Sequence, residues 1–179
     1  MRGLVLAGGL SERMGSPKAF LEYKDRPLYL RAFELLSPIC SEVYVSGRLG
    51  QYFDVPTIYD CNDFAGIGPA SGILSAYEQY NDTWFILACD FPLATYAAVN
   101  QLFKAHRPPA TYFGVDGQIE PLFSIWSPEA LETLKNNVKA GKTGPIYTLK
   151  AMGPYIEPLD KNWLVNTNTP EEWHALSAR

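Results

Sequence analysis

Short, uninterrupted apolar runs alternate with amphipathic segments along the first two-thirds of the chain. The apolar runs, which are typical of strands buried on both faces, cover residues 4–7, 43–46, 57–59 and 84–88. Residues 28–36 and 70–80 instead carry apolar side chains at helical spacing. This order predicts an α/β fold with three layers, in which a doubly wound, mainly parallel sheet has helices on both faces.

The pattern changes after the two prolines at 108–109. Residues 110–115 and 119–126 are expected to be strands, and the Asp116-Gly117 pair between them is typical of a tight hairpin. Strands joined in this way run antiparallel. The pattern in the last third of the chain therefore predicts a small antiparallel addition to the sheet.

Composition restricts the class of protein. The chain has 179 residues, of which 47% are hydrophobic and 19% charged, as expected for one globular domain with a sizeable core. The formal net charge of -4 provides no general attraction for a polyanion. Nucleic acid is therefore not an expected partner, and a phosphate-bearing ligand has to be held by a local group of donors.

The cysteines and the N-terminus indicate the compartment. Cys40, Cys61 and Cys89 are odd in number and never spaced as C-x-x-C, which argues against a disulfide framework and against a zinc knuckle. The apolar start at 4–7 is too short for a signal sequence or a membrane span. We expect a cytoplasmic protein that does not enter the membrane.

Residues 6–18 leave the first predicted strand as a glycine-rich loop with two cations. Gly8 and Gly9 let backbone N–H groups approach a phosphate closely, and Arg13 and Lys18 supply positive charge. The spacing matches neither the dinucleotide pattern G-x-G-x-x-G nor the P-loop pattern G-x-x-x-x-G-K-[ST]. The segment is a candidate triphosphate-binding loop, and a flexible surface loop is the alternative on spacing alone.

Two further segments stand at places where α/β sheets bind ligands. G-P-A-S-G at 68–72 opens the second predicted helix, where free N–H groups can hold a base or ribose edge, although a plain loop-to-helix turn also explains it. C-D-F-P at 89–92 follows a buried strand. The hard carboxylate oxygens of Asp90 suit magnesium there, and a structural Asx-turn is the alternative.

The segment 164–172 reads L-V-N-T-N-T-P-E-E. If it begins as a strand, Asn166 and Asn168 point the same way and their carboxamides converge on one site. Thr169, Pro170 and Glu172 form a capping box and are explained by the start of a closing helix. Only the two asparagines therefore need an active-site interpretation.

Together these segments resemble the MobA-type molybdenum cofactor guanylyltransferases, which are nucleotidyltransferases with a Rossmann-like fold. The match consists of L-A-G-G…S-x-R-M-G…K after the first strand, a G-P-x-x-G turn, C-D-x-P and N-x-N-T-P-E-[DE], in this order and over nearly the whole chain. The resemblance implies transfer of GMP from GTP to molybdopterin, with Mg²⁺ as cofactor and with release of pyrophosphate.

The resemblance also implies roles for individual residues. The expected catalytic residues are Arg13, Lys18 and Asp90, and the expected metal ligands are Asp90 and Asn168. Asn166, Pro121 and Leu122 are expected to contact the acceptor. The expected nucleotide-binding residues are Leu6, Ala7, Gly8, Gly9, Lys18, Ser46, Asp60, Gly68, Pro69, Gly72 and Asp90. Ser46 stands where such enzymes usually carry an asparagine.

We expect a single nucleotidyltransferase domain over residues 1–179, with a nucleotide-binding part at 1–107 and an acceptor-side lobe with the closing helix at 108–179. The double glycine favours guanine, because the related cytidylyl enzymes usually read L-A-A-G. CMP transfer to molybdopterin, nucleotidyl transfer to a sugar phosphate and a non-catalytic nucleotide-binding module stay open as alternatives. The expected partners are the small-molecule substrates. Contacts with other proteins of cofactor biosynthesis are a further option.

Overall fold

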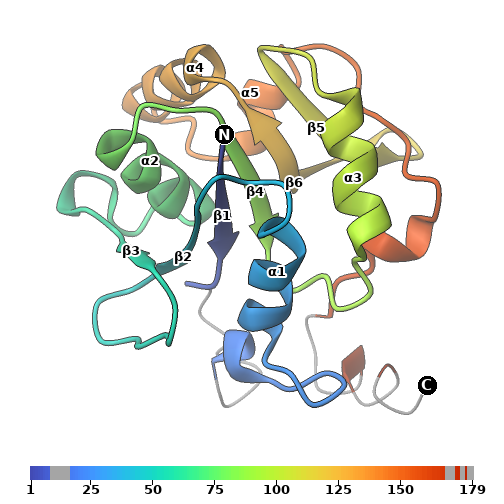
Figure 1. Cartoon of the computed structure of the whole chain (residues 1–179). Coiled ribbons are helices and arrows are strands. Elements are labelled where there is room, and N and C mark those ends of the chain that lie inside the picture. Colours follow the sequence, from blue (N-terminus) through green and yellow to red (C-terminus); the bar gives the residue numbers. More distant parts are fainter. Residues whose placement is uncertain (9–16, 168–171, 174–175, 177–179) are drawn as a thin grey trace.

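The computed structural model describes residues 1–8, 17–167, 172, 173 and 176. Within these residues, strands form one mixed sheet in the order β3-β2-β1-β4-β6-β5 (Figure 1). Their bounds are β1 Arg2–Leu6, β2 Val43–Gly47, β3 Thr57–Tyr59, β4 Trp84–Ala88, β5 Ala110–Val115 and β6 Gln118–Trp126. β1 to β4 are parallel to one another, and β6 pairs antiparallel with β4 and β5. The predicted fold class is confirmed.

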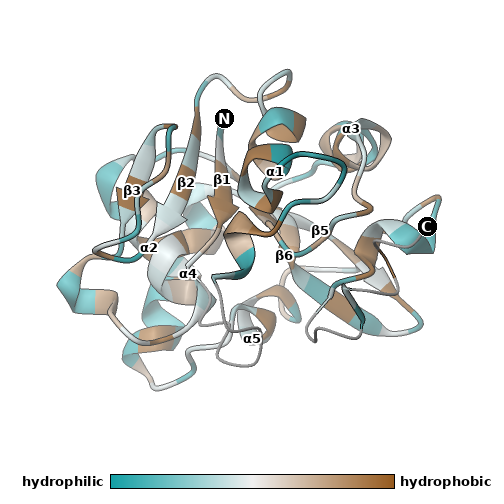
Figure 2. Cartoon of the chain, turned by 90° about the horizontal axis from the view of Figure 1, so that it is seen from below, coloured by the Kyte–Doolittle hydropathy of each residue, from teal (hydrophilic) through white to brown (hydrophobic). Residues whose placement is uncertain are grey.

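Helices cover both faces of the sheet (Figure 2). α1 (Leu28–Leu36) and α3 (Tyr96–Ala105) pack on one face, and α2 (Pro69–Gln79), α4 (Pro128–Lys139) and α5 (Pro145–Leu149) pack on the other. Successive side chains of each strand point to opposite faces of the sheet, which produces two separate cores. Val5 and Leu87 contact the first group of helices, whereas Leu4 and Ile86 contact the second. Short 3₁₀ helices are η1 (Lys18–Phe20), η2 (Asn62–Phe64) and η3 (Lys161–Leu164).

The predicted hairpin joins β5 to β6. Asp116 and Gly117 have φ angles of 52° and 82°, in the left-handed region that such a turn requires. Farther along, the pairing shifts: Tyr112 lies opposite Ser124, but the next residue, Phe113, lies opposite Glu120. Residues 121–123 therefore form a bulge in β6, a place where the missing N–H group of a proline is tolerated.

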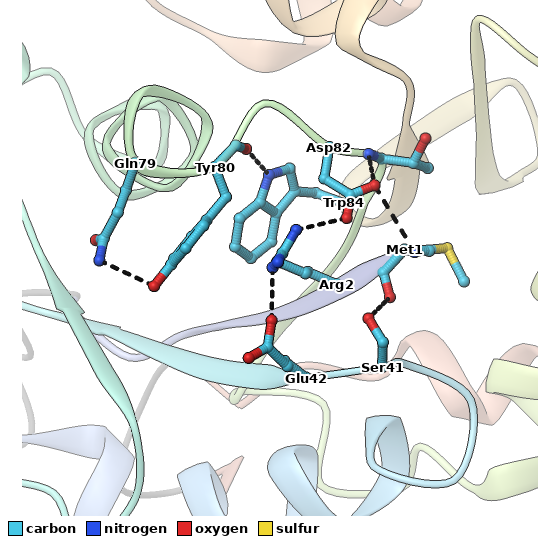
Figure 3. A network of polar contacts seen from close by, with 9 residues as sticks. Met1, Arg2, Ser41, Glu42, Gln79, Tyr80, Asp82 and Trp84 are labelled. Carbon is cyan, nitrogen blue, oxygen red and sulfur yellow. Dashed lines mark hydrogen bonds and ion pairs between the residues drawn. The ribbon is translucent and has the colours of Figure 1, made fainter.

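A polar network fixes the edge of the sheet at which β1 begins (Figure 3). Arg2 forms ion pairs with Glu42 at 2.8 Å and Asp82 at 2.6 Å, and its guanidinium lies 4.5 Å from the centre of the Tyr80 ring. Met1 O accepts a hydrogen bond from Ser41 Oγ. These contacts connect the start of β1 to the turns before β2 and β4. Contacts within the chain therefore hold this end of the three strands together.

Several local expectations were wrong or incomplete. Residues 165–167, where a strand was one interpretation, are not in a strand and follow η3, whose first turn is capped by Asp160 through the backbone N–H of Asn162. The helices α3 and α5 were not predicted. Among the described residues, no helix is long and apolar enough to cross a membrane. The predicted closing helix start at 169–171 lies outside the described residues.

Candidate active site

Four strand ends meet at one edge of the sheet, seen from below in Figure 2. Because β1 to β4 are parallel, their carboxyl ends share this edge, and the residues that follow them include Gly8, Arg48, Asp60 and Asp90. β6 is antiparallel to β4, so its first half, with Glu120, starts at the same edge. Open α/β sheets bind their ligands there.

Lys18 and Asp90 form an ion pair beyond the end of β4. The Nζ atom of Lys18 lies 3.3 Å from Oδ2 of Asp90, and the exposed fractions of the two side chains are 13% and 25%. η1 holds Lys18 in position, since Ala19 is buried in the core beside α1. The second oxygen of Asp90, Oδ1, is buried and accepts no hydrogen bond from the described residues. Such an oxygen is suited to a ligand that carries positive charge.

The site fits a divalent metal that is held jointly with substrate. The described residues contain no group of three or more His, Cys, Asp or Glu side chains able to hold a metal. Mg²⁺ is usually bound by one or two carboxylates together with substrate phosphates, and Asp90 Oδ1 offers a hard oxygen for this purpose. The other predicted ligand, Asn168, lies outside the described residues.

Cys89 lies next to Asp90 but is not an activated thiol. Burial raises its pKa to about 12, and the negative charge of Asp90 acts in the same direction. Its backbone N–H donates to the carbonyl of Leu6 at 3.1 Å, which continues the pairing of β4 with β1. The thiol is therefore neutral at pH 7 and plays a packing role.

Ala7 and Gly8 continue β1 into the glycine-rich loop. The Ala7 N–H donates to the carbonyl of Ser46 at 3.1 Å and so ties the loop to β2. A Cβ placed on Gly8 would meet Arg48 Cγ at 3.7 Å, an ordinary contact. Arg48 and the end of β2 therefore line this side of Gly8, and a Cβ would fit there without overlap. The predicted residues Gly9 and Arg13 lie outside the described residues.

Ser46, Leu6 and Gly72 lie together where α2 crosses the sheet. Ser46 is 3% exposed, and a Cβ on Gly72 would overlap its Oγ and lie 3.1 Å from a methyl group of Leu6. Helix and sheet therefore approach closely only because residue 72 is a glycine. Gly68 (φ 74°) and Pro69 begin α2 and are exposed at the same edge.

Asp60 follows β3 and lies near the cation Arg48. Burial raises the pKa of Asp60, and the positive charge of Arg48 lowers it. The backbone N–H of Asp60 donates to the carbonyl of Gly47 at 3.3 Å, so the end of β3 stays beside the end of β2. Arg48 was not among the predicted site residues. The signal that could have identified Arg48 is its position directly after a parallel strand, which it shares with Asp60.

The predicted acceptor residues Pro121 and Leu122 lie in the β6 bulge. The Leu122 N–H donates to Glu120 Oε1 at 3.0 Å, and Ser124 Oγ donates to the Pro121 carbonyl at 2.6 Å. Burial raises the pKa of Glu120 to about 7, the Leu122 N–H lowers it, and the charge of Asp90 raises it. The bulge thus brings a further carboxyl group into electrostatic reach of Asp90.

Two groups of predicted residues emerge from this placement. Lys18 and Asp90 are in contact at the β4 end of the edge, whereas Ser46, Asp60 and the start of α2 gather at the β2 and β3 end. Asn166 is exposed and follows η3, and its convergence with Asn168 stays a prediction because Asn168 lies outside the described residues.

The chain matches known proteins over most of its length. A model of the MobA-like NTP transferase domain matches residues 3–152. The molybdenum cofactor biosynthesis bifunctional protein of Synechocystis sp. is 32% identical over 98% of this chain, which spans 53%, about half, of that relative. The probable molybdenum cofactor guanylyltransferase of Bacillus cytotoxicus is 26% identical over 97% of this chain and 94% of its own length.

A solved structure supports the same fold. Molybdopterin-guanine dinucleotide biosynthesis protein A from Archaeoglobus fulgidus matches with a TM-score of 0.80 and 21% identity, over 99% of this chain and 97% of that one. The likeness extends to the antiparallel part of the sheet, because nearly the whole chain is covered.

Proposed function

Because the chain belongs to the MobA-like NTP transferase family, we propose that it transfers GMP from GTP to molybdopterin and releases pyrophosphate in a magnesium-dependent reaction. The observation that carries this proposal is the Lys18–Asp90 pair beside the glycine-rich end of β1. It combines a cation for phosphate with a buried carboxylate oxygen that has no protein donor among the described residues.

The proposed reaction is an in-line displacement at the α-phosphorus of GTP. An oxygen of the acceptor's terminal phosphate forms a bond to the α-phosphorus, the bond to the β-phosphate breaks, and pyrophosphate leaves with the electron pair. A covalent enzyme intermediate is not needed, which agrees with the neutral state of Cys89. Catalysis then consists of positioning and charge neutralisation.

Individual residues take the following roles in this proposal. The backbone N–H groups of Gly8 and Gly9 hold the triphosphate, Lys18 donates to the α-phosphate, and Arg13 binds the leaving pyrophosphate. Magnesium, when bound, offsets charge on the phosphate oxygens, and Asp90 together with Asn168 would hold it. The nucleoside lies over Ser46, Asp60 and the start of α2.

We further propose that residues 1–107 bind the nucleotide and that residues 108–179 form the acceptor side. Pro121 and Leu122 lie in the bulge of β6, across from the end of β4 that carries Asp90. An acceptor phosphate that approaches from this side meets the α-phosphate opposite the leaving group. The free cysteines of the chain fit a reducing cytoplasm as the place of the reaction.

A nucleotide panel tests this function. The protein is incubated with Mg²⁺, purified molybdopterin and, one at a time, GTP, CTP, ATP and UTP, and pyrophosphate release is followed. We expect release with GTP at least about tenfold faster in kcat/KM than with CTP, because unpaired polar groups in the wrong complex cost about 2 kcal/mol or more. Release should stop when molybdopterin is omitted or a chelator is added. A preference for CTP, or release that does not need molybdopterin, contradicts the proposed substrates.

A further inference from the structure

Arg48 is a half-buried cation at the ligand-binding edge whose guanidinium has no protein partner among the described residues. Its backbone N–H donates to Gln51 Oε1 at 2.8 Å, and its carbonyl accepts from the Gln51 N–H at 3.0 Å. The ion pairs of the described residues do not include its side chain. A partly desolvated guanidinium in this state is expected to serve an external acceptor.

The position of Arg48 is fixed from three sides. Its stem passes over Gly8, with Cγ at 3.7 Å from the place of a Cβ on that residue. Gly47, the residue before it, lies against the ring of Phe53, which is itself stacked on Phe20 with ring centres 5.2 Å apart. The reciprocal hydrogen bonds with Gln51 hold its backbone. These contacts hold the backbone of Arg48 and the first part of its side chain at the end of β2.

Asp60 is the charged neighbour of Arg48 in this corner of the site. The two lie within electrostatic reach of one another, yet they form no direct ion pair. This corner therefore offers both a cation with several N–H donors and a carboxylate with acceptor oxygens. This is a mixed donor and acceptor surface, which suits a nucleobase better than a phosphate.

The distance from the phosphate end of the site also favours the base. β2 and β4 are separated by β1, so their ends are two strand spacings apart, about 10 Å. Lys18 and Asp90 occupy the β4 end. A nucleotide has the length to connect the two places, with its α-phosphate at Lys18 and its base beside Arg48.

We propose that Arg48 is a specificity-determining residue that donates hydrogen bonds to O6 and N7 of the guanine base. Asp60 accepts hydrogen bonds from the adjacent edge of the same base. This inference rests on the proposed function. A guanidinium fork matches the O6 and N7 acceptors of guanine, whereas adenine places an amino donor at the first of these positions and cytosine has no N7. Arg48 thereby adds selection for guanine to the contribution of Asp60.

The test is a comparison of GTP with 7-deaza-GTP, which lacks only the N7 acceptor. Binding to the full chain is measured by calorimetry without acceptor, so that no turnover occurs. The wild-type protein should bind GTP about tenfold more tightly than 7-deaza-GTP, because a hydrogen bond from a charged donor is lost. The variant R48A should bind both nucleotides with equal, weaker affinity. R48K, which keeps a charged donor and loses the fork, should keep only part of the preference for GTP.

Controls separate this inference from the proposed function. Arg107 is exposed and its guanidinium donates to the carbonyl of His106, so R107A should behave as wild type. If R48A and R48K keep the wild-type preference for GTP over 7-deaza-GTP, Arg48 does not contact N7 and the inference is overturned. If wild type binds CTP as tightly as GTP, the proposed function fails first, whatever the variants do.

Discussion

Asp90 has two carboxylate oxygens in different surroundings. Oδ2 accepts from Lys18, and Oδ1 is buried with no donor among the described residues. If Oδ1 holds magnesium, D90N should lower turnover about a hundredfold or more, since about 3 kcal/mol of transition-state stabilisation is lost. Steady-state rates test this, with the exposed Asp63 as control in D63N. A folded D90N variant that turns over at the wild-type rate would rule out the metal role.

Lys18 is assigned to the α-phosphate, where negative charge develops in the transition state. K18A should therefore lower kcat as well as raise KM for GTP, by about tenfold or more in kcat. The exposed Lys104 on α3 offers a matched control in K104A. An unchanged kcat with a raised KM would mean that Lys18 binds substrate and transition state equally, contrary to its assignment.

Glu120 makes folding stability depend on pH. Its pKa is raised to about 7 by burial, so between its ordinary value of 4.5 and 7 the native state binds more protons than the unfolded state. The free energy of unfolding therefore falls as pH rises through this window, by at most about 3 kcal/mol. E120Q should be more stable than wild type at pH 8 and nearly equal to it at pH 4. Denaturant titrations in metal-free buffer measure this, and an equal difference at both pH values would contradict it.

The sequence predicted site residues best where a motif marks a strand end. Lys18 and Asp90 were expected at one site, and the structure brings them to 3.3 Å. Arg48 and Glu120 were not assigned roles, although each lies within two residues of a predicted site residue, Ser46 or Pro121. Arg48 becomes a candidate because its guanidinium has no partner within the described part of the chain, and Glu120 becomes one because it lies beside the bulge, within electrostatic reach of Asp90.

At the scale of elements, Gly72 of α2 packs tightly against Ser46 of β2. A Cβ on Gly72 would overlap Ser46 Oγ and lie 3.0 Å from Ser46 Cβ. G72A should therefore destabilise the protein by about 2 kcal/mol, despite the better helix propensity of alanine. The double variant S46A/G72A should recover part of this loss, because the overlapping oxygen is gone. Thermal or urea unfolding of both variants and of S46A alone measures the coupling, and strictly additive effects would contradict the overlap.

Element boundaries followed the hydrophobic pattern where that pattern was strong. The helix predicted at 28–36 matches α1, and the hairpin at Asp116 and Gly117 matches the turn between β5 and β6. α3 was missed because it buries only Ala98, Val99 and Leu102, a weak signal, and α5 has five residues. The strand considered after Leu164 is absent from residues 165–167, which follow a 3₁₀ turn that Asp160 caps.

At the scale of the whole molecule, the antiparallel strand β6 is inserted between β4 and β5. Hydrophobic patterns indicate that β5 and β6 form a hairpin, but they do not indicate which strand of the parallel sheet it joins. That choice depends on contacts between residues far apart in the sequence, such as Leu87 opposite Phe123. It also determines the candidate site, since it places Pro121 and Leu122 near Asp90.

The central claim is that the acceptor phosphate attacks the α-phosphorus of GTP. The most direct measurement uses GTP radiolabelled either at the α-phosphate or at the γ-phosphate, with Mg²⁺ and purified molybdopterin, followed by separation of the products. We predict that the α-label appears in the molybdopterin product and that the γ-label appears in pyrophosphate. A γ-label in the molybdopterin product, or an α-label that stays in free guanine nucleotide, would contradict nucleotidyl transfer by this site.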